Sequence, residues 1–146
     1  MDKLTIQHLS AYLPYRLKVI SNVNNHLYEV IGITKDEICI DDSTQGWFSY
    51  NLFKPVLRPM SYLTKEIEHN GEKFVPFDRL EKDFGVKLDE DGDLLIDYYN
   101  IGECDSPWTG FGIIQRLLSY HFDIWELISS GLAVDINQVK GDDNGI

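Results

Sequence analysis

The stretch from Trp108 to Gly131 constrains the fold most, because it is the longest periodic apolar run in the chain. Its apolar residues recur with the spacing of one face of an amphipathic helix. Ser106 and Pro107 suit the N-cap and the first helical position, and Gly131 suits the C-terminal end. We therefore predict one long helix over about residues 109–130, against which the preceding strands bury their apolar faces.

The N-terminal part predicts short strands in quick succession. Apolar β-branched and aromatic residues alternate with polar residues, and polar turns separate the runs. The predicted strands cover residues 16–21, 27–33, 38–40, 47–50 and 56–58. A single 3₁₀ turn is expected at 51–53, and the prolines around the fifth strand suit an edge position. This order is that of SH3-like small barrels, so residues 1–59 are expected to form an SH3-like subdomain.

The remaining residues, 60–146, are predicted to form an α+β subdomain that packs with the barrel as one unit. Asn70-Gly71 between alternating segments predicts a hairpin over 64–76, because a type I′ turn needs positive φ at both central residues. A short helix is expected to end at Gly85, and a second hairpin is expected to follow it. The fold class is therefore α+β, with an SH3-like barrel, hairpins and one long C-terminal amphipathic helix.

Charge excludes some classes of partner. The formal net charge is −11, and residues 78–146 carry fifteen acidic but only five basic side chains. Such a chain is repelled by nucleic-acid phosphates and by anionic lipid, which disfavours both partners. No run of 18 apolar residues occurs, and the N-terminus lacks the apolar core of a signal peptide. Two isolated cysteines, Cys39 and Cys104, are expected in a reducing cytoplasm.

The common catalytic and cofactor motifs are absent from the sequence. No nucleophile elbow, phosphate-binding loop or dinucleotide fingerprint occurs. His121 and Asp123 are two residues apart on the predicted helix and so face different ways. The acidic run around Gly92 lacks the terminal carboxylates of a calcium loop, and a hairpin turn on Asp91-Gly92 fits it better. We therefore predict no catalytic residue, no metal site and no cofactor.

Exposed aromatic and acidic side chains are the candidates for binding a protein. Aromatic residues near the loops of SH3-like folds often line a groove, and an acidic, aromatic surface attracts a basic partner. The candidate partner-binding residues are Trp47, Tyr50, Asp89, Glu90, Asp91, Asp93, Asp97, Tyr99 and Trp108. A solvated face that only keeps the chain soluble is the alternative interpretation of the acidic half.

Three stretches give the chain a resemblance that covers nearly its whole length. They read YLPYRLKV, KPVLRPMSYLTKEIEHNGEKFVP and LLSYHFDIWELISSGLAVDIN. The chain resembles a group of small proteins encoded by phages and prophages of gut Bacteroides-type bacteria. That family carries no assigned activity, so the resemblance transfers no functional residue. It implies an accessory protein of a mobile element that acts in the cytoplasm of a bacterial host.

The leading hypothesis is a non-enzymatic protein-interaction module, which in a phage context would modulate a host protein. Its expected contact surface is the acidic half of the chain. An acidic mimic of nucleic acid is the second hypothesis, and it requires carboxylates at phosphate-like spacing without intermixed cations. A small enzyme with a site between the two halves is the third, and it requires a pocket with convergent polar groups. Direct nucleic-acid binding by the near-neutral N-terminal half is the fourth.

Overall fold

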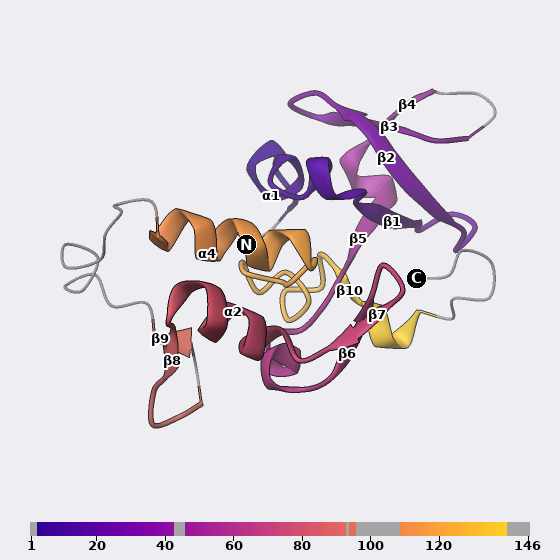
Figure 1. Ribbon diagram of the computed structural model, residues 1–146. Coiled ribbons are helices and arrows are strands. Elements are labelled where there is room, and N and C mark those ends of the chain that lie inside the picture. Colours follow the sequence, from indigo (N-terminus) through magenta and orange to yellow (C-terminus); the bar gives the residue numbers. More distant parts are fainter. Residues whose placement is uncertain (1–2, 43–45, 93, 96–108, 140–146) are drawn as a thin grey trace. The chain divides into compact units, whose positions relative to one another are not determined.

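The computed structural model describes residues 3–42, 46–92, 94–95 and 109–139, and these residues form an α+β fold (Figure 1). The chain divides into two compact units. The first unit joins Met1–Met60 to Leu118–Ile146, and the second unit is Ser61–Leu117. We expected a boundary near the same point, with the C-terminal segment in the second half. The structure instead gives that segment to the first unit.

One sheet of six strands forms the frame of the first unit. Its strands stand in the order β10-β5-β1-β2-β3-β4, and every neighbouring pair is antiparallel except β10 and β5. Figure 1 shows β1 to β4 winding back and forth before β5 returns beside β1. The strands are β1 (Lys18–Ser21), β2 (Leu27–Ile33), β3 (Glu37–Ile40), β4 (Trp47–Ser49), β5 (Phe53–Leu57) and β10 (Val134–Asp135). The five predicted N-terminal strands are therefore confirmed, within a few residues at their ends.

The sheet is open rather than closed. Among the described strands, β10 and β4 form its two edges, so these strands do not complete the expected barrel. The prolines around β5 predicted an edge position, but β1 and β10 flank this strand on both sides. β10 pairs only with Val56 and Leu57, so its ladder begins beyond Pro55, which has no N–H to donate.

Three short helical segments complete the described N-terminal part: α1 (Ile6–Ser10), η1 (Leu13–Tyr15) and the 3₁₀ turn η2 (Tyr50–Leu52). Thr5 is the N-cap of α1, and its reciprocal partner at the third helical position is His8 rather than the usual Glu or Gln. The Nδ1 atom of His8 lies 3.0 Å from the Thr5 backbone nitrogen and accepts its hydrogen bond. The His8 ring also meets Trp125 edge to face, with the centroids 5.5 Å apart.

The second unit contains the predicted hairpin. Its strands β6 (Ile67–His69) and β7 (Glu72–Phe74) pair in antiparallel fashion. Asn70 and Gly71 form the turn with φ angles of 53° and 81°, as a type I′ turn requires. η3 (Met60–Thr64) precedes this hairpin.

A helix and a second hairpin follow in the second unit. α2 (Pro76–Phe84) ends as predicted at Gly85, whose φ of 68° closes the helix in the left-handed conformation. β8 (Lys87–Leu88) and β9 (Leu94–Leu95) form the second hairpin. The side chains of Asp83 and Arg116 form an ion pair at 2.7 Å. A Cβ atom at Gly112 would lie 3.0 Å from the Phe84 ring, so close packing explains this glycine.

The long C-terminal helix is shorter than the sequence predicts. α4 (Thr109–Ser119) begins where expected but ends eleven residues before residue 130, and turns follow it. His121 and Glu126 have φ angles of 66° and 57°, which no α-helix accommodates. The Asp123 carboxylate accepts hydrogen bonds from the backbone nitrogens of Leu127 and Ile128, at 2.8 and 2.9 Å. Such a side chain competes with helical hydrogen bonding.

A strand-like pairing with Arg58 replaces the continuation of that helix. The Arg58 backbone nitrogen donates to His121 O at 2.7 Å, and Asp123 N donates to Arg58 O at 2.8 Å. Phe122 is held between these two bonds, fully buried, in a parallel bridge with Arg58. Several apolar residues after Ser119 are buried, as their periodicity predicted. They are buried by pairing with a distant segment and not by a helix. The short η4 (Ile136–Gln138) follows β10.

The hydroxyl of Tyr12 fixes this C-terminal segment from the N-terminal side. It donates to Phe122 O and lies 3.4 Å from the Ile124 backbone nitrogen, which donates to it. Burial raises the pKa of this phenol far above its usual value, so Tyr12 remains a neutral donor.

We expect Tyr12→Phe to destabilise the protein by about 1–3 kcal/mol, because it leaves the buried carbonyl of Phe122 without its donor. Urea denaturation monitored by circular dichroism measures this change. Tyr15→Phe is the matched control, since no hydrogen bond of the Tyr15 hydroxyl to a described residue is present. Equal stability of the two variants would contradict the role assigned to Tyr12.

We further expect stability to fall as pH drops below 6.5, in part through His8. Burial lowers the pKa of His8 from its ordinary value of 6.5. The unfolded chain therefore takes up a proton on this residue at a higher pH than the folded chain does. The contribution is complete above pH 6.5 and declines until the pH reaches the folded pKa. His8→Gln keeps a capping acceptor but does not titrate, so its denaturation midpoint should change less between pH 7.5 and 5.5. An unaltered pH dependence would argue against this assignment.

Candidate functional site

The acidic candidates Asp89, Glu90 and Asp91 lie exposed in the turn between β8 and β9. The Asp89 carboxylate accepts a hydrogen bond from the Asp91 backbone nitrogen at 2.9 Å, and Gly92 has a φ of 83°. These features are those of a hairpin turn, which confirms the sequence interpretation. Asp89 therefore supports the local backbone as well as contributing negative charge.

Four further candidates, Asp93, Asp97, Tyr99 and Trp108, lie outside the described residues. The extent of an acidic and aromatic surface in this part of the chain stays a prediction.

Tyr50 differs from an exposed aromatic contact. Its side chain is 7% exposed, and its hydroxyl donates to the backbone oxygen of Thr34 in the turn between β2 and β3. Burial, followed by the nearby charge of Asp36, raises the pKa of the Tyr50 phenol. This phenol therefore stays protonated at neutral pH and fixes the turn.

Of the two described aromatic candidates, Trp47 is the one that is exposed to solvent. It begins β4, the edge strand of the sheet, and is 49% exposed. Trp47 pairs with Cys39 on β3, and Cys39 pairs with Gly32 on β2, so the three residues form a row across the sheet. Cys39 is buried, whereas much of the indole remains accessible.

A second exposed apolar side chain, that of Ile31, lies at a β-bulge in β2. Val30 pairs with Ile40 but Gly32 pairs with Cys39, so β2 contains one extra residue at Ile31. Because Val30 is buried, alternation turns Ile31 to the opposite, outer face, and the bulge lets Gly32 oppose Cys39 on that face as well. Ile31, which is 48% exposed, therefore shares the outer face with Gly32 and Trp47.

Gly32 also sets the position of the indole. A Cβ atom at this residue would lie only 3.2 Å from Cη2 of Trp47, closer than ordinary van der Waals contact. We call Ile31, Gly32, Cys39 and Trp47 the edge surface. Of these four residues, only Trp47 was a candidate from the sequence. A glycine inside the strand pattern LYEVIGI was the available signal, since such a glycine often marks a bulge or a close approach.

Carboxylates flank the edge surface. Glu37 is exposed and pairs with Ser49, and strand alternation puts it on the same face as Cys39 and Trp47. Asp41 follows β3 and is also exposed. The edge surface thus combines an accessible indole, an aliphatic side chain and nearby negative charge.

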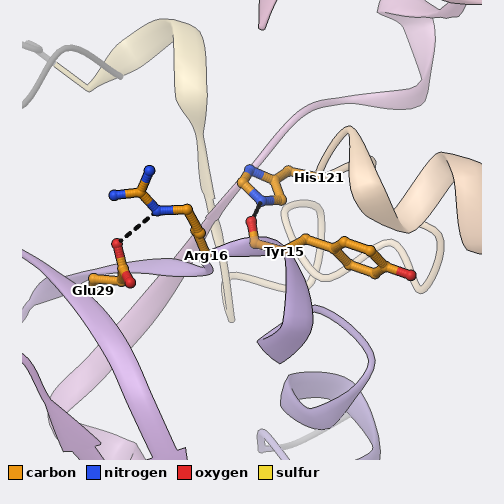
Figure 2. A network of polar contacts seen from close by, with 4 residues as sticks. All are labelled: Tyr15, Arg16, Glu29 and His121. Atoms are coloured by element: carbon orange, nitrogen blue, oxygen red, sulfur yellow. Dashed lines mark hydrogen bonds and ion pairs between the residues drawn. The ribbon is translucent and has the colours of Figure 1, made fainter. Parts of the chain in front are cut away.

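His121 and Asp123 each form hydrogen bonds with backbone groups. The expectation that they face different ways assumed a helix through both residues, but α4 ends at Ser119 before it reaches them. Figure 2 shows the His121 ring directed at the Tyr15 carbonyl, with Nε2 2.6 Å from that oxygen. Since a carbonyl only accepts, Nε2 carries the proton. Beside it, Nε of Arg16 lies 3.2 Å from Glu29, in an exposed ion pair. Asp123 meanwhile accepts two backbone hydrogen bonds. These contacts hold the segment after α4 in place.

The described residues contain no group of three or more His, Cys, Asp or Glu side chains placed to hold a metal ion. Within the same part of the chain, no helix has the length and apolar character needed to cross a lipid bilayer.

Comparisons with known proteins give no relative from which a site could be transferred. No family model, no curated protein and no solved structure matches this chain. Its candidate site therefore rests on the geometry of its own residues.

Proposed function

We propose that the chain is a protein-interaction module that binds an extended, basic segment of a partner protein along β4. The observation that carries this proposal is the exposed indole of Trp47 on the edge strand of an open sheet, beside the exposed Ile31. An edge strand offers N–H and C=O groups to an added strand, and neighbouring side chains supply specificity.

The chemistry around the edge surface favours a basic partner segment. Trp47 has the aromatic face that attracts a lysine or arginine side chain most strongly. Glu37 supplies a carboxylate on the same face, and the net charge of −11 favours encounter with cations. Ile31, on β2, extends the apolar part of the face that carries Trp47.

Two expectations from the sequence support an interaction role. The strand order, with a 3₁₀ turn before β5, is the order of SH3-like domains, in which aromatic residues often bind peptides. The resemblance to phage-encoded proteins supports a bacterial host protein as the partner, met in the host cytoplasm. Both expectations belong to the proposal and add to the geometry of the edge surface.

The nucleic-acid mimic is the weaker alternative. It requires a continuous array of carboxylates, yet cations are interspersed among them in the second unit. Arg79 pairs with Glu72 at 2.9 Å, and Arg116 pairs with Asp83 at 2.7 Å. The acidic turn between β8 and β9 would serve as a secondary, electrostatic contact for a basic partner.

Selection from a random library of ten-residue peptides displayed on phage tests the proposal. We expect the selected peptides to alternate lysine or arginine with apolar residues. Trp47→Ala should weaken their binding about tenfold, as loss of a central aromatic anchor does. Fluorescence polarisation measures the affinities. Val23→Ala is the matched control, because Val23 is a 78% exposed apolar residue outside the edge surface.

Backbone pairing is tested separately with an unchanged protein. In an added strand, the N–H groups of every second residue point toward β4. Methylating those nitrogens should abolish binding, whereas methylating the intervening nitrogens, which point away from β4, should not. Binding should also protect the amides of Trp47 to Ser49 from hydrogen exchange. Selected peptides without basic residues, or equal affinity for the wild type and Trp47→Ala, would overturn the proposal.

A further inference from the structure

A cavity in the first unit has a net positive charge in its lining, although the chain as a whole is acidic. Its volume is about 490 Å³, within the range typical of small-molecule sites. It lies where the residues leading into α1, the turn between β2 and β3, the turn η2 and the start of β5 meet. Three lysines line it, Lys3, Lys35 and Lys54, together with a single carboxylate, Asp36.

The lining of this cavity has an excess of positive charge, with three lysines against one carboxylate. Among the described residues, none of the three lysines forms an ion pair, although acidic side chains outnumber basic ones nearly two to one. Like charges gathered in a concave site repel one another and raise the local potential. An anion with several acceptor oxygens relieves that repulsion and accepts charge-assisted hydrogen bonds.

Part of the cavity lining is apolar and buried. Leu4, Tyr50 and Phe53 form this part, and each is less than 10% exposed. Neutral hydrogen-bonding side chains complete the lining, and Thr5 and Ser49 are examples. The cavity thus combines a cationic group of side chains with an apolar wall, which matches a ligand that has a charged end and an aromatic or aliphatic body.

We propose that this cavity binds a small organic phosphate. The phosphoryl group lies among Lys3, Lys35 and Lys54, and the body of the ligand packs against the apolar wall. The site is separate from the edge surface, because β4 contributes only Ser49 to it. A phosphate suits the lysines better than a carboxylate, because it carries more charge and three acceptor oxygens.

Isothermal titration calorimetry with 1-naphthyl phosphate tests the proposal. We expect saturable binding at one site, at least about tenfold tighter than binding of inorganic phosphate or of the neutral 1-naphthol. Inorganic phosphate carries the charge without the apolar body, and 1-naphthol carries the body without the charge. The affinity should fall as salt concentration rises, because lysines supply the attraction.

Single substitutions locate the site. Lys35→Gln and Lys54→Gln should each weaken binding of 1-naphthyl phosphate about three- to tenfold. Asp36→Asn removes the carboxylate that repels the anion and should tighten binding, a gain that general damage to the fold would not produce. Lys73→Gln is the matched control, because Lys73 is an exposed lysine on β7 in the second unit.

Thermal denaturation of each variant confirms that it is folded before its affinity is compared. Absence of saturable binding by 1-naphthyl phosphate would overturn the proposal. Equal binding by the wild type, Lys35→Gln and Lys54→Gln would also overturn it, because the ligand would then occupy another place. Equal affinity for the phosphate ester and for 1-naphthol would show that the phosphoryl group contributes nothing to binding. The cavity would then be an apolar pocket and not an anion site.

Discussion

The first unit depends on the pairing of Arg58 with the segment that follows α4. Arg58 exchanges two backbone hydrogen bonds with His121 and Asp123, and the Phe122 carbonyl accepts the hydroxyl of Tyr12. The Arg58 side chain is 4% exposed, and its Nε donates to Tyr120 O at 3.3 Å. Burial lowers the pKa of this guanidinium, which the charge of Asp135 opposes. The pairing continues the line of β5 and brings β10 alongside it, so residues distant in sequence complete one sheet.

The sequence predicted those parts of the fold that local chemistry decides. Asn70-Gly71 specifies a turn by its φ angles, and Gly85 ends α2 for the same kind of reason. Strand alternation located β1 to β4 within a few residues. The end of α4 was not predictable in this way, because a distant backbone competes for residues 121–123. Whether the sheet is open or closed likewise depends on which strands pair with one another. The sequences of short strands do not specify their partners.

The candidate sites follow the same division. Trp47 stood out in the sequence as an aromatic residue on a predicted strand, and the structure places it at the sheet edge. Ile31 faces outward by alternation from the buried Val30, and the bulge adds Gly32, which strict alternation would have turned inward, to the same face. The three cavity lysines are as far apart as residues 3 and 54, and no periodicity connects them. A site whose residues come from separate turns and from the chain end has no periodic signal in the sequence, so only the three-dimensional structure brings its residues together.

The hydrogen bond from Tyr12 to Phe122 spans 110 positions of the chain and has a consequence for synthesis. The N-terminal strands leave the ribosome long before their C-terminal partners exist, and the whole of Ser61–Leu117 emerges in between. During that interval β5 has no β10 beside it, and Tyr12 has no carbonyl to which it can donate. The nascent first unit is therefore an incomplete sheet with an unsatisfied edge, which is the kind of surface that chaperones recognise and that favours aggregation. Completion of this unit has to wait until translation has passed β10, which ends at Asp135.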